Sequence, residues 1–394
     1  MACVFSASAA KQKKALVVIV DGVCTDVVER LRVPVLYDIA YKGFIGESYV
    51  GGERGAYSQT PTISAVGYNT MLTGTWVNKH NVWGNSDMHP NYNYWTIFRI
   101  AKAQQRPVST AIFSSWTDNR TVLLGEGLES NDNLKIDYVY DGYDLDKEHY
   151  PHKEKDLHVF DYDEAVSANA AECIRRDAPD LSWVYLWYPD DAAHRYGDGA
   201  YQDEYVLKAG EQIARVWEAV KYREQNFDEE WMVVVTTDHG RKFLGHKHGG
   251  QSDRERRTWI ATNVKPNKHF REGRAAMVDI NPSICRFMGF EIPFEVMAEL
   301  DGVPFIGKLD VVDMTLARYD DTVTISWKAL DRKAGVDIYV AVGNGYKETG
   351  SEHWDKIATV KAGEEKYVYN MPDQRFRKFL LVAPDNTQNR WYCE

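Results

Sequence analysis

Three apolar runs each lead into an aspartate, and this pattern constrains the fold more than any other feature of the 394-residue chain. Ala15–Val20 reads Ala-Leu-Val-Val-Ile-Val without alternation, as expected for a strand that is covered on both faces. Asp21 follows this strand directly, and Asp190 and Asp238 follow two further apolar runs. Because the carboxyl ends of parallel strands meet at one edge of an open α/β sheet, these three carboxylates are predicted to converge.

The rest of residues 15–304 alternates strand-like and helix-like segments. This order predicts an α/β domain with a mostly parallel sheet and helices on both faces. In segment 203–225 apolar residues recur with a period near 3.6, which indicates a helix packed on the core. The predicted strands are Ala15–Val20, Phe44–Val50, Ser109–Ser114, Trp183–Trp187 and Trp231–Thr236, and the predicted helices are Asp163–Arg176 and Asp203–Gln225.

The alternation of helices and strands stops after Pro293–Pro304. From Val311 to Glu394 short alternating strands are separated by turns rich in Asp, Gly and Asn, which predicts a small all-β sandwich domain. With Trp327 on an early strand and a closing Lys-Phe-Leu-Leu-Val-Ala-Pro run, residues 311–394 resemble a fibronectin type III-like module. Its predicted strands are Thr322–Trp327, Val336–Val342, Lys356–Val360, Lys366–Tyr369 and Lys378–Ala383.

Acidic residues outnumber basic ones, 58 to 47, so the formal net charge is −11. This balance disfavours a protein that coats nucleic acid or anionic membrane, although it is compatible with a local positive site for an anionic substrate. No apolar run reaches the roughly 20 residues of a membrane-spanning helix. We therefore expect neither a nucleic-acid coat protein nor a membrane span.

Residues 1–14 pass from a small-residue stretch into Lys11, Lys13 and Lys14 and resemble the end of a secretory signal. This interpretation predicts a periplasmic or secreted protein. The positively charged start of such a signal is missing, and a disordered cytosolic tail is the alternative.

The chain offers oxygen and nitrogen ligands for metal. Its five cysteines form no Cys-x-x-Cys pair, which argues against a cysteine zinc site and a dense disulfide framework. His194 follows Asp190 at a spacing that one helical turn can bring to the same cation, and His239 adjoins Asp238. Three Asp and three or four His indicate two metal ions, and these ligand types suit zinc, with manganese or iron as alternatives. The further histidines are His246 and His248.

Ser64 is the candidate nucleophile. It is predicted to cap a helix that runs to Thr73 and ends at Gly74, which would place its hydroxyl at the positive end of the helix dipole. That position suits a phosphate. Ser64 could also be a simple helix cap, and Thr60 and Thr62 compete for the same position.

Four short motifs in chain order resemble the alkaline phosphatase superfamily, and within it the type I phosphodiesterase and nucleotide pyrophosphatase branch, over about residues 15–300. The motifs are Asp21-Gly22 after a strand, Pro61-Thr62-x-Ser64 with Leu72-Thr73-Gly74, Pro189-Asp190-x-x-x-His194 and Asp238-His239-Gly240. The resemblance implies one metal held by Asp190, His194 and His248, and a second held by Asp21, Asp238, His239 and the Ser64 oxygen.

The resemblance also implies a mechanism, in which Ser64 attacks phosphorus in line, a phosphoserine forms, and two metals neutralise the entering and leaving oxygens. Two positions depart from the family pattern. Its phosphodiesterases usually carry Thr as nucleophile and an Asn three residues later, where this chain has Ser64 and Gly67. In place of the family's Asn, the hydrogen bond to the phosphoryl oxygen would come from Asn69, Asn85 or a backbone amide.

The stretch between Trp83 and Asp161 is rich in Trp, Tyr and Asn, and its aromatic residues could stack a base or another flat leaving group. Asn85 and Trp116 are the predicted substrate-binding residues, with ordinary core packing as the alternative for any one aromatic residue. A monoesterase would need a cation against the extra phosphate charge. The candidates are Arg54, Arg120 and Arg254.

We therefore expect a two-metal hydrolase of small phosphate esters, nucleotides included, of the phosphodiesterase or nucleotide pyrophosphatase type. A phosphomonoesterase, a phosphonate hydrolase or a mutase of the same superfamily would share every ligand. A sulfatase is disfavoured because the chain has no Cys/Ser-x-Pro-x-Arg segment. The non-enzymatic alternative is a cell-surface binding protein whose β-sandwich recognises carbohydrate and whose metal site is vestigial.

Overall fold

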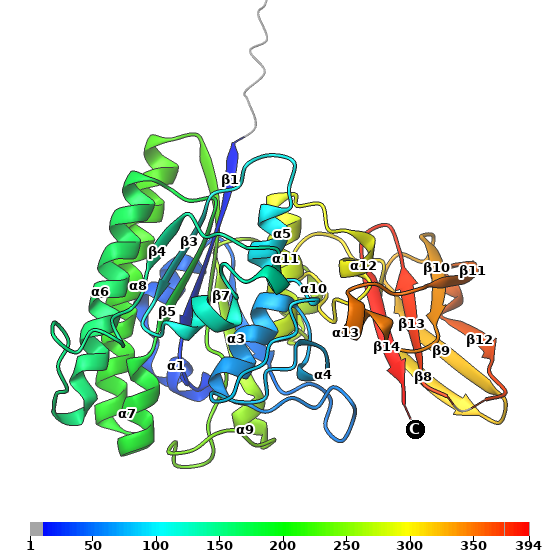
Figure 1. Cartoon of the computed structure of the whole chain (residues 1–394), viewed down its shortest axis with the longest axis horizontal. Coiled ribbons are helices and arrows are strands. Elements are labelled where there is room, and N and C mark those ends of the chain that lie inside the picture. The colour runs from blue at the N-terminus through cyan, green and yellow to red at the C-terminus, as the bar shows by residue number, and fades with distance from the viewer. Residues whose placement is uncertain (1–10, 374, 394) are drawn as a thin grey trace, which may run out of the picture.

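The computed structural model describes residues 11–373 and 375–393, and it comprises a large α/β part followed by a smaller all-β part (Figure 1). Most of the signal-like segment 1–14 lies outside the described residues. Its last three residues belong to the first strand, in which Lys14 is buried and pairs with Asp180 at 3.1 Å. Secretion therefore stays a prediction. No helix among the described residues is long and apolar enough to cross a membrane.

A seven-stranded sheet forms the centre of the α/β part. Its strands are β1 (Gln12–Val20), β2 (Phe44–Tyr49), β3 (Thr110–Ser114), β4 (Tyr138–Tyr140), β5 (Leu181–Leu186), β6 (Glu229–Thr236) and β7 (Arg257–Thr262). They lie in the order β2-β7-β6-β1-β5-β3-β4, with β1 paired in parallel to both β5 and β6. Of these seven strands only β7 runs opposite to the others, which confirms the predicted mostly parallel sheet.

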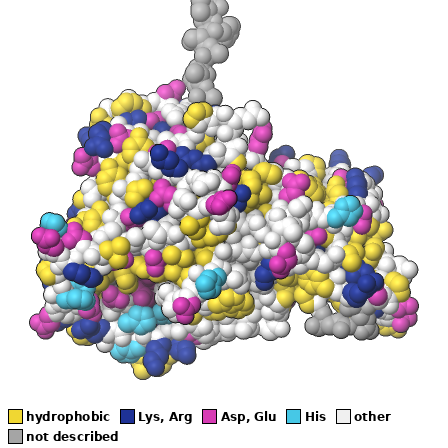
Figure 2. All heavy atoms as spheres, viewed as in Figure 1, with side chains coloured by type: hydrophobic (Ala, Val, Ile, Leu, Met, Phe, Trp, Pro, Cys, Tyr) yellow, Lys and Arg dark blue, Asp and Glu magenta, His cyan; other side chains and the backbone are white. Residues whose placement is uncertain are grey.

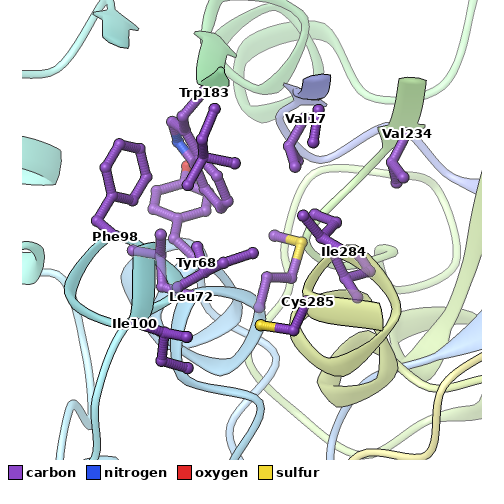
Figure 3. Packing of buried hydrophobic residues seen from close by; sticks show 14 of the residues in the cluster. Val17, Tyr68, Leu72, Phe98, Ile100, Trp183, Val234, Ile284 and Cys285 are labelled. Atoms are coloured by element: carbon purple, nitrogen blue, oxygen red, sulfur yellow. The ribbon is translucent and has the colours of Figure 1, made fainter. Parts of the chain in front are cut away.

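Helices cover both faces of the sheet. Successive residues of a strand point to opposite faces, and in β1 the side chains on both faces are buried, so both faces need a covering layer. Val17 of β1 packs with α3 (Ser64–Thr73) and α11 (Ile280–Met288) on one face (Figure 3). Its neighbour Val18 packs with α6 (Leu157–Arg176) and α8 (Ala200–Asn226) on the other. The remaining helices are α1 (Thr25–Leu31), α2 (Pro34–Ile39), α4 (Val77–His80), α5 (Ile97–Lys102), α7 (Tyr188–Tyr196), α9 (Asp253–Arg256), α10 (Lys268–Arg271), α12 (Phe294–Met297) and α13 (Gly345–Thr349).

The all-β part contains two antiparallel sheets that share one hydrophobic core. Its strands are β8 (Val311–Tyr319), β9 (Thr322–Ala329), β10 (Gly335–Ala341), β11 (Asp355–Lys361), β12 (Lys366–Asn370), β13 (Arg377–Val382) and β14 (Thr387–Tyr392). One sheet has the order β11-β10-β13-β14 and the other β12-β9-β8. Ile325 of the smaller sheet and Ile338 of the larger sheet belong to the same buried cluster, so the sheets pack face to face.

Buried ion pairs join the two parts of the chain. Lys79 of α4 is fully buried and donates to Asp301 Oδ1 at 2.7 Å and to Asn389 Oδ1 of β14 at 2.9 Å. Lys378 of β13 is also fully buried and pairs with Glu299. The all-β part is therefore fixed to the α/β part close to α4, which follows α3 in the chain.

Candidate active site

The ends of the three central strands supply three aspartates to one place. Asp21 follows β1, Asp238 follows β6 after one residue, and Asp190 is the third residue of α7, which follows β5. The amide of Gly22 donates to Asp238 Oδ1 at 3.0 Å, which joins the ends of β1 and β6. The strand-end aspartates therefore lie together, as the parallel order predicts.

One cluster of potential metal ligands consists of Asp190, His194 and His248. Asp190 and His194 are one helical turn apart on α7, and His194 Nε2 lies 3.2 Å from Asp190 Oδ2. The same Nε2 lies 3.0 Å from His248 Nε2, which comes from the loop after β6. Two ring nitrogens and a carboxylate oxygen therefore face one point, in the arrangement that a transition metal requires.

A second cluster is fully buried and centres on His239. Its Nε2 lies 3.5 Å from Asp21 Oδ1, 3.3 Å from Asp238 Oδ2 and 3.3 Å from Ser64 Oγ. The rings of His239 and His248 stack with their centroids 3.7 Å apart, so the two clusters adjoin. The ligand atoms of Asp21, Asp238 and His239 all lie within 4.8 Å of one another.

Hydrogen bonds to the backbone orient the three histidine rings. Each Nδ1 faces a carbonyl oxygen: that of His246 for His194 at 2.9 Å, of Gly240 for His239 at 3.0 Å, and of Thr62 for His248 at 2.9 Å. An Nδ1–H that donates to a carbonyl leaves the lone pair of Nε2 free for metal. The predicted alternative, His246, contributes its carbonyl oxygen to this arrangement.

The second cluster also contains oxygen atoms without a hydrogen-bond donor. Asp21 Oδ1 and Asp238 Oδ2 are buried and accept no hydrogen bond from any described residue. Burial raises the pKa of Asp21 well above its ordinary value and raises that of Asp238 to about 7, with crowding by the other carboxylates as a further cause. Burial lowers the pKa of His239. A metal cation would satisfy these carboxylates, so the residues present fit the metal ions that the sequence predicts.

Ser64 is the first residue of α3, and Ile63 occupies the N-cap position, so the predicted capping role of Ser64 is wrong. Its hydroxyl faces His239 instead of bonding to a backbone amide of its own helix. The helix ends at Gly74 in the left-handed region, with φ of 67°, as predicted. The departure from the capping role leaves the Ser64 oxygen available for chemistry.

Gly67, one of the two departures from the family pattern, has a packing reason. A Cβ atom at this position would lie 2.8 Å from the carbonyl oxygen of Asp238. The absence of a side chain at Gly67 therefore lets α3 approach the strand end that carries Asp238 and His239.

The structure places both predicted substrate-binding residues near α3. Asn85 Oδ1 accepts a hydrogen bond from the amide of Ala65 at 2.9 Å, which holds its side chain beside Ser64. Trp116 is half-buried and packs edge-on against Tyr68, with ring centroids 6.3 Å apart. Asn69, the other amide considered, is buried within α3.

Four residues that support the site were not predicted. Tyr68 and Tyr185 both donate to Asp21 Oδ2, Tyr185 at 2.6 Å. Arg241 is fully buried and pairs with Asp190 Oδ1. Asp163 of α6 accepts hydrogen bonds from the amides of Trp187 at 2.8 Å and Tyr188 at 2.7 Å, which fixes the start of α7. The position of Arg241 directly after Asp238-His239-Gly240 was the one signal in the sequence that could have indicated any of them.

Thr62 connects the segment before Ser64 to the loop of His248. Its hydroxyl donates to the carbonyl oxygen of Gly250 at 2.9 Å and accepts from the amide of Gly249 at 3.0 Å. With the bond from His248 to its own carbonyl, Thr62 makes three contacts with consecutive residues of the loop. Thr62 is therefore a positioning residue for His248.

The three candidate cations for an extra phosphate charge are all paired with carboxylates. Arg120 pairs with Asp141 at 2.6 Å and with Glu126 at 2.7 Å. The other two pairings are Arg254 with Asp26 and Asp198, and Arg54 with Asp253.

Comparisons with known proteins identify a family and a fold. A model of the type I phosphodiesterase / nucleotide pyrophosphatase family matches residues 15–282. No curated protein sequence matches the chain.

Among solved structures, a 2-O GAG sulfatase has a TM-score of 0.53 at 12% sequence identity, over 91% of this chain and 85% of that chain. Ps i-CgsB in complex with a neocarrahexaose has a TM-score of 0.51 at 12% identity, over 81% and 82%. Murine ectonucleotide pyrophosphatase / phosphodiesterase 5 has a TM-score of 0.47 at 13% identity, over 71% and 96%. The first two likenesses show a shared fold.

Proposed function

Because the chain belongs to the type I phosphodiesterase / nucleotide pyrophosphatase family of the alkaline phosphatase superfamily, we propose that it is a zinc-dependent phosphodiesterase that uses Ser64 as its nucleophile. The observation that carries the proposal is the position of Ser64 Oγ, 3.3 Å from His239 Nε2, at the point where two ligand clusters meet. Family membership supports phosphoric ester hydrolysis, and the diester substrate, the zinc and the residue roles are our inference.

Two ions fit the two clusters. One would be held by Asp190, His194 and His248, and the other by Asp21, Asp238 and His239 together with the Ser64 oxygen. When bound, zinc ions would supply Lewis acidity that stabilises the entering and leaving oxygens and favours the ionised hydroxyl.

The residues of the chain then account for the reaction. Ser64 gives up its hydroxyl proton to solvent, and its Oγ forms a bond to phosphorus while the bond from phosphorus to the leaving oxygen breaks. The leaving oxygen takes up a proton from solvent, which gives an alcohol or phosphate product and a phosphoserine that still carries the second ester group. Ser64 lies at the N-terminus of α3, where the helix dipole would favour the negative charge of the attached phosphoryl group. Asn85, held beside Ser64 through Ala65, is placed to donate its amide to a phosphoryl oxygen. Attack by water on phosphorus releases Ser64 and the second product.

Charge favours a diester over a monoester. A monoester carries one more negative charge at the phosphoryl group, and its recognition calls for an unpaired cation close to the site. Each of the three candidate cations, Arg54, Arg120 and Arg254, forms a salt bridge with a carboxylate. Arg241 lies closest to the ligand clusters, but it is paired with Asp190. We infer that none of these four side chains is free to select the dianionic phosphate of a monoester.

A substrate panel tests the proposal. Zinc-loaded protein is assayed at equal concentration with bis-p-nitrophenyl phosphate, p-nitrophenyl thymidine monophosphate, p-nitrophenyl phosphate, p-nitrophenyl sulfate and phosphonoacetate. We expect kcat/KM to be highest for the two diesters. A preference for the monoester, the sulfate or the phosphonate would overturn the diester assignment. No turnover of any substrate by protein with full zinc content would favour a binding protein with a vestigial site.

The domain organisation belongs to the same proposal. We infer that residues 15–304 form the hydrolase domain and residues 311–394 a fibronectin type III-like domain. The second inference is supported by the three-stranded and four-stranded antiparallel sheets that pack across one core.

A further inference from the structure

A third group of potential metal ligands lies outside the active site, in the segment that leads into α6. His152, Asp156 and His158 each offer a ligand atom, and these atoms lie within 4.8 Å of one another. The same proximity is found in the active site for Asp190, His239 and His248 and for Asp21, Asp238 and His239. The two imidazole rings have centroids 4.4 Å apart.

We propose that His152, Asp156 and His158 bind one zinc ion that is separate from the ions of the active site. Two imidazole nitrogens and one carboxylate oxygen are a usual protein ligand set for zinc, with the remaining coordination position taken by water. The inference does not depend on the proposed phosphodiesterase activity.

The backbone brings these side chains together within seven residues. Lys155 and Asp156 both have left-handed conformations, with φ of 59° and 55°, and the turn returns the chain so that His152 lies over His158. His158 is buried and His152 is exposed, so the group opens to solvent on one side. His158 Nδ1 accepts a long hydrogen bond of 3.3 Å from the amide of Lys153. An ion at Nδ1 would replace this bond.

The third ligand, Asp156, has one oxygen available. Its Oδ2 pairs with Arg195 of α7, which leaves Oδ1 for a cation. The carbonyl oxygen of Lys155 accepts a hydrogen bond from Tyr188 of α7 at 2.7 Å. Because α7 also carries Asp190 and His194, an ion at this position would fix segment 152–158 against the helix that supplies two ligands of the active site.

On the face drawn in Figure 2, several histidine side chains lie on the surface at the lower left, over the region where Figure 1 shows α7. Within the proposed site His152 is exposed, so zinc can reach the site from solvent.

Zinc analysis of one exposed variant tests the proposal. Wild-type protein, His152→Ala and the matched control His149→Ala, which is exposed three residues earlier, are loaded with zinc alone, freed of excess and analysed for metal. We expect three equivalents in the wild type and the control, and two in His152→Ala. Equal zinc content in all three proteins would overturn the proposal. If the active site binds no zinc, the zinc content of all three proteins falls by the same amount. The difference of one equivalent between the wild type and His152→Ala still tests the proposed site.

Limited proteolysis gives a second measurement that is independent of activity. Lys153 and Lys155 are exposed trypsin sites inside the proposed loop. We expect zinc to slow cleavage after these residues in the wild type by about tenfold or more and to have no effect in His152→Ala. Equal cleavage rates with and without zinc in the wild type would contradict a zinc site here.

Discussion

Arg241 holds Oδ1 of Asp190 and leaves Oδ2 of the same carboxylate facing the metal-ligand cluster. Although burial opposes ionisation of this carboxyl group, the guanidinium keeps the pKa of Asp190 well below its usual range. Arg241 also donates to the carbonyl oxygens of Gly22 at 3.1 Å and Gly245 at 2.8 Å. One side chain therefore joins the end of β1, the start of α7 and the loop after β6.

Replacing Arg241 should reduce the stability of the folded protein. Arg241→Gln removes the cation and leaves the Asp190 carboxylate buried without its partner, which should cost about 3–5 kcal/mol in the free energy of unfolding. Arg241→Lys keeps the charge but loses the forked hydrogen bonds, so its loss should be smaller. Chemical denaturation measures both. Arg332→Gln, at an exposed position of the all-β part, should change stability by less than about 0.5 kcal/mol. Equal stability of Arg241→Gln and Arg332→Gln would contradict the role of Arg241.

Replacing Ser64, the proposed nucleophile, should abolish catalysis without loss of metal. Ser64→Ala removes one oxygen from a cluster in which Asp21, Asp238 and His239 remain, so the zinc content should not change. The value of kcat on bis-p-nitrophenyl phosphate should fall by at least about 10³-fold, because no oxygen can form the covalent intermediate. Ser182→Ala is the matched control, since the Ser182 hydroxyl is buried on β5 and has no hydrogen-bond partner among the described residues. Substantial turnover by Ser64→Ala would rule out Ser64 as nucleophile.

Thr62 offers a test of positioning. Loss of its hydroxyl in Thr62→Ala removes the bonds to Gly249 and Gly250, so His248 should be held less firmly. We expect the zinc affinity of the cluster that contains His248 to fall by about 10–100-fold. Thr62→Ser keeps the hydroxyl and should restore the affinity. A zinc titration with a competing chelator measures these values. An unchanged affinity in Thr62→Ala would show that the loop of His248 keeps its conformation without the Thr62 hydroxyl.

The sequence predicted the convergence of the candidate ligands better than the residues that support them, for a physical reason. Asp21, Asp190 and Asp238 follow strands, and the parallel order alone brings them to one edge. The partnership of Arg241 with Asp190 depends on how a loop folds back across the sheet, which no local pattern encodes. The predicted strands and helices were confirmed, but β4 and β7 of the large sheet and β8 and β14 of the all-β part were missed. β4 is three residues long, and β7 directly follows a charged segment that hides its apolar pattern.

His80 should make the stability of the protein sensitive to acid. Burial lowers its pKa from 6.5 to about 3, while its Nδ1 accepts from the amide of Val82 at 3.1 Å. Between these two pH values the unfolded chain binds one more proton than the folded chain, so protonation favours unfolding as the pH falls. For this group the free energy of unfolding should drop by about 2 kcal/mol from pH 6.5 to pH 5.

Urea denaturation across this pH range measures the effect. His80→Gln lacks the titrating group, so its stability should fall less steeply with acid than that of the wild type. His353→Gln, at an exposed position, should keep the wild-type slope. Identical slopes for the wild type and His80→Gln would show that His80 is not a source of the pH dependence.

The buried contact between the two parts of the chain should be essential for stability. Lys378→Met leaves Glu299 and Glu352 without their shared cation in a buried position, which should cost about 3–5 kcal/mol. Lys366→Met, on the exposed side of β12, should have little effect. Denaturation midpoints compare the two. Equal midpoints would mean that the all-β part adds little to the stability of the α/β part.

The order of strands has a consequence for protein engineering. β1, β5 and β6 are neighbours at the centre of the sheet, and the Asp and His residues proposed to hold the two active-site ions all come from the segments that follow these three strands. The loops after β3 and β4, which contain Trp116 and Asp144, follow strands on the outer side of β5. Segments of this kind tolerate insertion and exchange better than the central frame. Libraries that randomise these outer loops should therefore change substrate preference while the chemical centre keeps its geometry.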